Sequence, residues 1–377
     1  MERLYFDYNA NTPIRPEVID IMAEIMSVPG NASSVHYHGR LGRKHVEHAR
    51  KIIAEGLNSR PEQVVFNSGA TESNNTILKH FDQEDIWVSA VEHSSVSRVV
   101  ADARRIPVTK DGVVDLEALK EMLEAGPLPK LISVMFVNSE TGVIQPIKEI
   151  CDLAHHYGIK VHSDAVQAIG RVNVDMKTLG LDYLSLSAHK IGGPQGCGAL
   201  VLGPCEEAPK FMHGGSQENH RRAGSENVAG IAGFGKAMEL ALGQIDHYEG
   251  LAKWRDKIEE AMCATEPSMV VNGKNAPRTG NTLNISWPGQ LASMLLMNFD
   301  LEGVSLSTGS ACSSGSIKPS PVIKAMGADD DVALGTLRIS MGWNTQEAEV
   351  DAFIERWKKI ASRVQEGAKA EAEKVTA

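Results

Sequence analysis

The sequence predicts an α/β protein with a large domain built on a mainly parallel sheet and a smaller α+β domain. Three observations support this prediction. The middle of the chain alternates short β-branched runs with helix-length stretches, which is typical of parallel sheets covered by helices. The length of 377 residues is enough for two domains. The 34 glycines suit the many tight turns between strands and helices.

The expected strands of the large domain follow one another between residues 63 and 187. They are Gln63–Asn67, Asp85–Ser89, Leu131–Val137, Ile159–His162 and Tyr183–Ser187. Helix-length stretches lie between several of these strands, for example from Ile147 to Tyr157. Ligands of such sheets bind beyond the carboxyl ends of the strands, so we expect the functional residues there.

The character of the sequence changes after about Gly243. A long helical run from Ile245 to Ala264 leads to a strand candidate at Thr282–Trp287, and the tail from Glu347 onward predicts a charged amphipathic helix. We therefore expect two domains. Their boundaries are 15–245 for the large domain, and 1–14 with 246–377 for the small domain.

Composition and charge exclude several classes of protein. A net charge of −10 argues against a general nucleic-acid surface. No apolar stretch approaches the roughly 20 residues that span a bilayer, and the first residues lack the apolar core of a signal peptide. We therefore expect a cytoplasmic protein without direct membrane contact.

The five cysteines form an odd set without CxxC spacing, which favours neither a disulfide framework nor a zinc site. No other metal site is expected. Four of the cysteines are expected to be small core or near-surface residues. They are Cys151, Cys197, Cys205 and Cys263.

Cys312 is different, because it lies in a run of ten residues, Ser307–Ser316, in which only the cysteine is larger than Thr. Such a run buries little apolar surface, so it predicts a mobile loop that presents the thiol. Taken alone, an ordinary Ser/Gly loop with an incidental cysteine explains the segment equally well.

Ser68–Ser73 follows one expected strand and precedes a helix. Small residues at such a turn let backbone N–H groups and the Thr71 hydroxyl converge on an anion. The segment matches neither GxGxxG nor GxxxxGK[ST], and by itself a plain capped turn is the simpler interpretation.

Two neighbouring strands end in charged residues. Asp164 could pair with a cationic ring nitrogen, and Lys190 could form a Schiff base with an aldehyde. With a phosphate cradle, these are the groups that a pyridoxal phosphate site requires. Singly, a strand-end Asp is more often a helix cap and a lone Lys is usually solvated.

Eight segments occur in a characteristic order. They are Tyr5–Pro13, Ser68–Ser73, Val91–His93, Val137–Gly142, His162–Gln167, Ser187–Lys190, Arg221–Asn227 and Ser310–Gly315. This order resembles that of the cysteine desulfurases, the pyridoxal phosphate enzymes of the class V aminotransferase group that supply sulfur for iron–sulfur clusters and tRNA thiolation. The resemblance runs from about residue 4 to about residue 355. It implies the type I fold of pyridoxal-phosphate-dependent transferases.

The resemblance implies roles around the cofactor ring. Lys190 matches the Schiff-base lysine that also moves the Cα proton. Asp164 matches the carboxylate that keeps the pyridine nitrogen protonated, and Gln167 matches the partner of the phenolic oxygen. His93 matches the imidazole that stacks on the ring and shuttles protons.

Further roles are implied for the phosphate, the substrate and the sulfur. Asn138 and Arg338 match the groups that hold the substrate carboxylate, for which a planar guanidinium is well suited. Ser225 matches a hydroxyl that reaches the phosphate of the partner subunit, which implies a homodimer. Cys312 matches the nucleophile that takes sulfur from L-cysteine as a persulfide, leaves L-alanine, and passes the sulfur to an acceptor such as an iron–sulfur scaffold or a tRNA-thiolation protein. The implied phosphate ligands are Ala70, Thr71, Ser187 and His189.

The chain departs from the family pattern at several positions, although none of them removes a catalytic group. The tail lacks the aromatic extension that engages the scaffold in some members, which puts that docking in doubt. A selenocysteine lyase, an aminotransferase and a non-catalytic binding protein are the alternative interpretations. The departures are Asn11, Ala32, Gly192, Gln195, Lys318 and Trp343.

Overall fold

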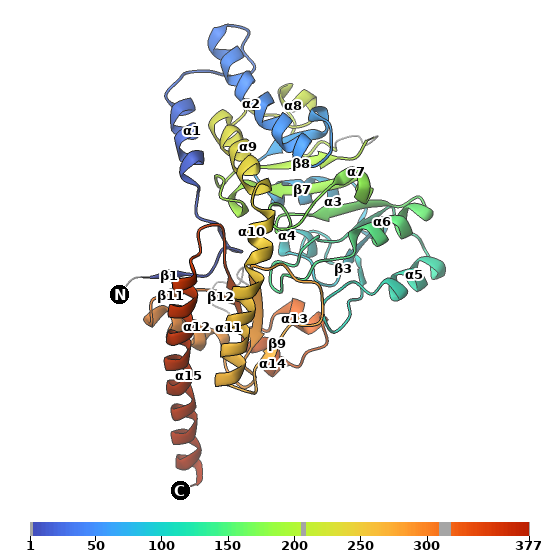
Figure 1. Ribbon diagram of the computed structural model, residues 1–377. Coiled ribbons are helices and arrows are strands. Elements are labelled where there is room, and N and C mark those ends of the chain that lie inside the picture. Colours follow the sequence, from blue (N-terminus) through green and yellow to red (C-terminus); the bar gives the residue numbers. More distant parts are fainter. Residues whose placement is uncertain (1–2, 205–208, 309–317, 377) are drawn as a thin grey trace.

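The computed structural model describes residues 3–204, 209–308 and 318–376 (Figure 1). The segment around Cys312 therefore lies outside the described residues, and so does Cys205, one of the four cysteines predicted to be core or near-surface residues. Cys151 and Cys197 are buried and Cys263 is half-buried, as predicted. No helix of the described ranges combines the length and the apolar character that crossing a membrane requires.

A seven-stranded sheet forms the centre of the large domain, and the predicted α/β class is confirmed. All neighbouring strands are parallel except β8, which is antiparallel to both of its neighbours. The order across the sheet is β2 (Val64–Asn67), β8 (Gly198–Leu202), β7 (Tyr183–Ser187), β6 (Lys160–Asp164), β5 (Leu131–Ser133), β3 (Ile86–Ser89) and β4 (Arg104–Ile106).

The prediction that one strand continues to Val137 is wrong, because β5 ends at Ser133. The N–H group of Met135 donates to the Glu92 carboxylate at 2.7 Å instead of to a neighbouring strand. This bond ties the chain after β5 to the turn after β3.

Helices cover the sheet of the large domain. On α2, Val46, Ala49 and Ile53 are buried at helical spacing, and this face packs against α9. Gly235 of α9 permits the two helices to approach each other closely, since a Cβ at this position would lie 2.7 Å from Ala49. The helices are α1 (Pro16–Met26), α2 (Tyr37–Gly56), α3 (Ala70–Leu78), α4 (Ser94–Ser97), α5 (Leu116–Ala125), α6 (Ile147–His156), α7 (Met176–Leu179), α8 (Gln217–His220) and α9 (Val228–Leu242).

The second half of the chain forms a separate layer of short strands and helices. Strand β1 (Leu4–Tyr5) pairs in parallel with β11 (Val304–Ser305). An antiparallel sheet has the order β12 (Ser307–Thr308), β13 (Thr336–Ser340), β10 (Thr282–Ser286) and β9 (Val270–Val271). The helices are α10 (Ile245–Gly250), α11 (Ala252–Thr265), α12 (Ala292–Leu301), α13 (Pro321–Ala325), α14 (Asp330–Leu334) and α15 (Glu347–Thr376).

The helix expected from Ile245 to Ala264 is divided at Leu251. The backbone of Gly280 packs against this break, where an added Cβ would lie 2.3 Å from the carbonyl oxygen of Tyr248. Helix α15 extends along one side of the layer and beyond it (Figure 1).

Two of the hydrophobic clusters lie on different sides of the expected division of the chain, while a smaller one joins Val91 to Val322 and Ile323 across it. One large cluster takes its residues from Val18 to Ala241. A second contains Leu4 and Phe6 together with residues between 248 and 361, including the stacked rings of Phe299 and Trp357. This packing supports the predicted boundaries near 14 and 245, which stay a prediction.

Candidate active site

A cavity of about 830 Å³ opens beyond the carboxyl ends of the parallel strands, and both halves of the chain line it. Arg338 comes from β13 and Val322 from α13. Nine residues singled out from the sequence line the same cavity. They are Ala70, Thr71, His93, Asp164, Gln167, Ser187, His189, Lys190 and Arg338.

Lys190 ends the short 3₁₀ helix Ala188–Lys190 that follows β7. Its Nζ donates to the backbone carbonyls of Asn9 and Ala10, at 2.5 Å and 2.6 Å. Burial, together with the positive charges of Arg338 and Arg171, lowers the pKa of Lys190 to about 7. The amine is therefore available as a nucleophile or base near neutral pH.

Asp164 ends β6 and is buried. Its Oδ2 accepts a hydrogen bond from Asn74 Nδ2 at 2.8 Å, and its Oδ1 accepts one from the N–H group of Val166 at 3.1 Å. Gln167 lies three residues further, in the turn after β6, and donates to the carbonyl of Asn9 at 3.0 Å. A carboxylate and an amide thus face the cavity from neighbouring positions.

The N-terminus of α3 forms one wall of the cavity. Gly69 precedes it with φ +148°, a conformation that favours glycine, and Ser187 Oγ lies 4.0 Å from where a Cβ of Gly69 would be. Ala70 and Thr71 at the start of the helix and Ser187 all line the cavity here. The N–H groups of a helix N-terminus together with hydroxyl groups suit a phosphate. Glu72 braces this turn through bonds to Ser68 and an ion pair with Arg222.

His189 lies between this wall and Lys190. Its Nδ1 is 3.0 Å from Asn11 Oδ1. Burial, together with the charge of Lys190, lowers the pKa of His189 to about 4. The ring is neutral near pH 7, so it can donate a hydrogen bond to an anion without adding a second charge next to Lys190.

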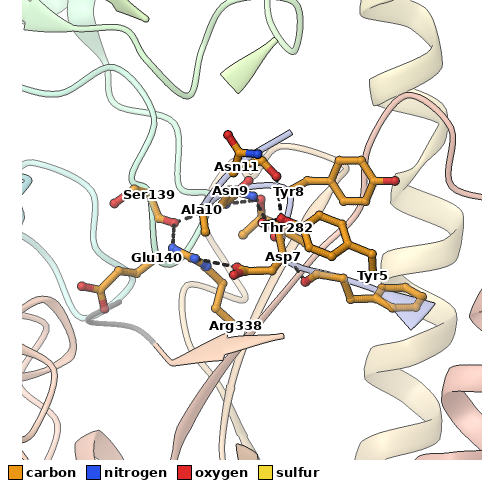
Figure 2. A network of polar contacts seen from close by, with 12 residues as sticks. Tyr5, Asp7, Tyr8, Asn9, Ala10, Asn11, Ser139, Glu140, Thr282 and Arg338 are labelled. Atoms are coloured by element: carbon orange, nitrogen blue, oxygen red, sulfur yellow. Dashed lines mark hydrogen bonds and ion pairs between the residues drawn. The ribbon is translucent and has the colours of Figure 1, made fainter. Parts of the chain in front are cut away.

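Arg338 also lines the cavity, and Figure 2 shows its side chain with the contacts to Asp7 and Ser139. Its side chain is only 4% exposed, and its Nη2 pairs with Asp7 Oδ1 at 2.8 Å. Its Nη1 donates to the backbone carbonyl of Ser139 at 3.1 Å. A fixed guanidinium that faces a cavity is suited to bind a carboxylate.

Two residues singled out from the sequence do not line the cavity. Asn138 is buried, and both ends of its carboxamide are already bonded. Its Oδ1 accepts from the N–H groups of Glu140 and Thr141 within its own turn, and its Nδ2 donates to the carbonyl of Val91 in the turn after β3. Ser225 is exposed between α8 and α9. Its expected role toward a partner subunit stays a prediction.

Several residues that shape the cavity were not singled out from the sequence. Asn9 offers its backbone carbonyl to both Lys190 and Gln167, and a backbone role leaves no signal in residue type. Glu92 lies beside His93 in a quoted motif, yet only the structure shows it buried against Ser89 and Met135. Asn74 directly follows Ser68–Ser73. It could have been found from the sequence as a polar residue on the face of the expected helix that packs against the sheet.

The donor set fits pyridoxal phosphate. One amine, one buried carboxylate and a helix N-terminus with hydroxyl groups line the cavity together. These are the partners that the aldehyde, ring nitrogen and phosphate of the cofactor require. The residues that could hold these groups are Lys190 for the aldehyde, Asp164 for the ring nitrogen, Gln167 for the phenolic oxygen, His93 for the ring face, and Ala70, Thr71, Ser187 and His189 for the phosphate.

Comparisons with known proteins agree with this arrangement. A family model for aminotransferase class-V matches residues 4–353. The cysteine desulfurase IscS of Dictyoglomus turgidum is 38% identical over 376 residues, covering 96% of this chain and 95% of that protein. The X-ray structure of a NifS-like protein from Rickettsia africae has a TM-score of 0.89 at 34% identity, covering 96% of this chain and 100% of that chain. A solved structure of SspA in complex with cysteine has a TM-score of 0.77 at 29% identity, covering 90% and 98% of the two chains. The chain belongs to the cysteine desulfurases of the class V aminotransferase family.

Proposed function

We propose that this protein, with pyridoxal phosphate bound, converts L-cysteine to L-alanine and leaves the sulfur on Cys312 as a persulfide. One observation carries the proposal: the amine of Lys190, the carboxylate of Asp164 and the guanidinium of Arg338 face the same cavity. An amino acid bound there meets a carboxylate-binding group and a base at the same time. The relative that was solved in complex with cysteine supports cysteine as the substrate.

Arg338 binds the carboxylate of the substrate and so orients its Cα toward Lys190. Asp7 holds the guanidinium from the side, at 2.8 Å. When bound, pyridoxal phosphate supplies an electron sink for the carbon from which a proton is removed. Lys190 is the base for that proton, because burial lowers the pKa of its amine to about 7, so the uncharged form is populated near neutral pH.

The sulfur is transferred to Cys312. Its thiolate attacks the sulfur of the substrate, an S–S bond forms and the S–Cβ bond breaks, with the electron pair going to Cβ, which then takes up a proton. Lys318, which follows the Cys312 segment, lines the cavity and supports delivery of that segment to the site. His93 also lines the cavity and is placed to move protons during these steps.

The finer parts of the proposal concern partners and location. The exposed Ser225 is proposed to complete the phosphate site of a second subunit, so the active form is a homodimer. The persulfide is proposed to pass to an acceptor protein of iron–sulfur cluster assembly or tRNA thiolation, in the cytoplasm. Relatives named IscS support cluster assembly as the pathway and do not favour an aminotransferase or a selenocysteine lyase.

Mass spectrometry after turnover with L-cysteine tests the proposal. We expect Cys312 to gain one sulfur atom and the solution to contain alanine rather than pyruvate. Cys312→Ser should keep the visible absorbance of the cofactor and produce neither alanine nor sulfide, while Cys263→Ser serves as the matched control and should behave as the parent. Normal sulfide release by Cys312→Ser would exclude Cys312 as the sulfur acceptor.

A further inference from the structure

A carboxylate lies at the wall of the cavity where the phosphate is expected. Glu72 is the third residue of α3, lines the cavity, and has a side chain that is only 9% exposed. Its Oε2 accepts hydrogen bonds from the N–H group of Ser68 at 2.9 Å and from the Ser68 hydroxyl at 2.6 Å. Glu72 thus holds the turn before the helix, and it places a carboxylate next to a proposed anion site.

Glu72 is ionised at neutral pH. Burial alone would favour the uncharged acid, but the hydrogen bonds from Arg222 and Ser68 outweigh it and lower the pKa of Glu72. The expected phosphate ligands add no positive charge, because His189 is neutral near pH 7 and the other three have uncharged side chains. Without a partner, Glu72 would therefore repel a phosphate at this wall.

Arg222 supplies the opposite charge from behind the wall. Its Nε donates to Glu72 Oε1 at 2.9 Å and its Nη2 donates to Glu72 Oε2 at 3.2 Å, so the guanidinium contacts both carboxylate oxygens. The Arg222 side chain is 22% exposed and does not line the cavity. It therefore acts on the cavity through the charge of Glu72.

The chain reaches Arg222 through a turn of unusual backbone conformation. Residues 218–220 have φ between +48° and +65°, although none of them is glycine, and such a conformation persists only where the surroundings hold it. The carboxylate of Glu218 holds this turn, because it pairs with Arg50 at 2.7 Å and accepts from the N–H group of Phe66 at 2.9 Å. The turn is thus fastened to β2, the strand that leads into the phosphate wall.

We propose that Arg222 is a positioning residue that neutralises Glu72 and so allows the wall at the start of α3 to accept the phosphate of the cofactor. The inference rests on the proposed function, in which pyridoxal phosphate binds in this cavity. Glu72 keeps the turn at Ser68 in shape, and Arg222 removes the repulsion that this carboxylate would otherwise exert on the phosphate.

The test compares two ligands on the full chain freed of cofactor. Equilibrium dialysis gives the dissociation constants of pyridoxal phosphate and of pyridoxal, which has the same ring and aldehyde but no phosphate. Arg222→Gln should raise the constant of pyridoxal phosphate about 10- to 50-fold and that of pyridoxal by no more than about twofold, because the exposed charge of Glu72 acts on the phosphate.

Arg221→Gln is the matched control. It removes the same charge from the neighbouring residue, whose guanidinium bonds to the carbonyl of Glu62 instead of to Glu72. Both dissociation constants should stay within about twofold of the parent, because a charge without a partner at the wall contributes little.

The double variant Glu72→Gln/Arg222→Gln separates charge from shape. It keeps an oxygen that can accept from Ser68 and carries neither charge, so the affinity for pyridoxal phosphate should return to within about threefold of the parent. Loss of Arg222 could instead act by displacing the nearby Ser225. Glu72→Gln would not repair such a displacement, so recovery assigns the effect to the charge.

Three results would each overturn the proposal. They are an unchanged affinity for pyridoxal phosphate in Arg222→Gln, an equal loss of affinity for pyridoxal, and a double variant that binds as weakly as Arg222→Gln. The proposed function fails separately, because these affinities are measured without cysteine. If the parent binds pyridoxal phosphate and makes no alanine from cysteine, the desulfurase activity is refuted while the affinities still decide the role of Arg222.

Discussion

The guanidinium of Arg338 is paired with the carboxylate of Asp7, with 2.8 Å between Nη2 and Oδ1. Asp7 lies directly after β1, between that strand and Asn9. A residue near the N-terminus therefore orients Arg338, which lies more than 300 positions later in the sequence. Arg338 Nε is buried without a hydrogen-bond partner among the described residues. The pair with Asp7 and the bond from Nη1 to the Ser139 carbonyl therefore hold the guanidinium at its two terminal nitrogens, on the wall of the cavity.

Replacing Asp7 should therefore weaken substrate binding. In Asp7→Ala, Arg338 loses the contact that orients it, and we expect KM for cysteine to rise about tenfold while kcat changes less. Steady-state kinetics measure both constants. Asp7→Asn keeps an oxygen acceptor in the same place and should stay within about threefold of the parent. An unchanged KM in Asp7→Ala would show that Arg338 is oriented by other contacts.

The low pKa of Lys190 predicts how the protein takes up its cofactor. Below pH 7 the amine carries a proton and cannot attack an aldehyde, and above pH 7 it is free because burial disfavours its charge. The rate at which protein freed of cofactor forms a borohydride-trappable link with pyridoxal phosphate should rise through about pH 7 and then level off. A rate that keeps climbing toward pH 10, the range of an ordinary lysine, would contradict this assignment, and Lys190→Ala should form no link.

The sequence predicted the groups of the site that stand at the ends of strands. Asp164 ends β6 and Lys190 follows β7, and the carboxyl ends of neighbouring parallel strands meet at one edge of a sheet. Their approach therefore follows from the order of the elements. The role of Arg338 followed from the family resemblance alone, because its strand belongs to the other sheet.

What holds these groups in place was not predictable in the same way. Lys190 donates to backbone carbonyls of residues 9 and 10, and every residue type offers such a carbonyl. Asn74 reaches Asp164 across 90 positions of sequence, so its role depends on how α3 lies against the sheet. Asn138 shows the opposite case, since its motif predicted substrate binding and its amide is used within a turn.

Burial of Glu92 predicts a pH-dependent stability. Burial raises the pKa of Glu92 to about 8 from 4.5, and the negative charge of Asp164 adds to this effect. Because the folded pKa lies above the unfolded one, the contribution of Glu92 to stability is complete below about pH 4.5. It is lost as pH rises to about 8, by about 1 kcal/mol per pH unit.

Glu92→Gln tests this prediction. A glutamine keeps the oxygen that accepts from Ser89 and from the N–H group of Met135, and it stays neutral at every pH. The free energy of unfolding, measured with urea at several pH values, should therefore fall less between about pH 5 and pH 8 in Glu92→Gln than in the parent. Parallel curves for the two proteins would show that Glu92 does not titrate in this range.

Gly192 allows Arg15 to pack against the turn that follows Lys190. Its φ is +83°, and an added Cβ would lie 2.7 Å from Arg15 Cγ. The Arg15 guanidinium stacks on the Trp343 ring at 4.9 Å and donates to Gln244 at 2.7 Å, so this side chain is held on both sides. Gly192 and Trp343, two of the departures from the family pattern, thus share one neighbour.

Gly192→Ala should therefore lower the free energy of unfolding by more than a positive φ alone would. Gly158 has φ +70° with no atom within 4 Å of its added Cβ, which makes Gly158→Ala the matched control. We expect Gly158→Ala to lower the free energy of unfolding by about 1 kcal/mol and Gly192→Ala by about 2 to 4 kcal/mol, since the second also displaces Arg15. Urea unfolding measures both values. Equal losses would mean that Arg15 moves aside freely, and its contacts with Trp343 and Gln244 would then contribute little to the turn that carries Lys190.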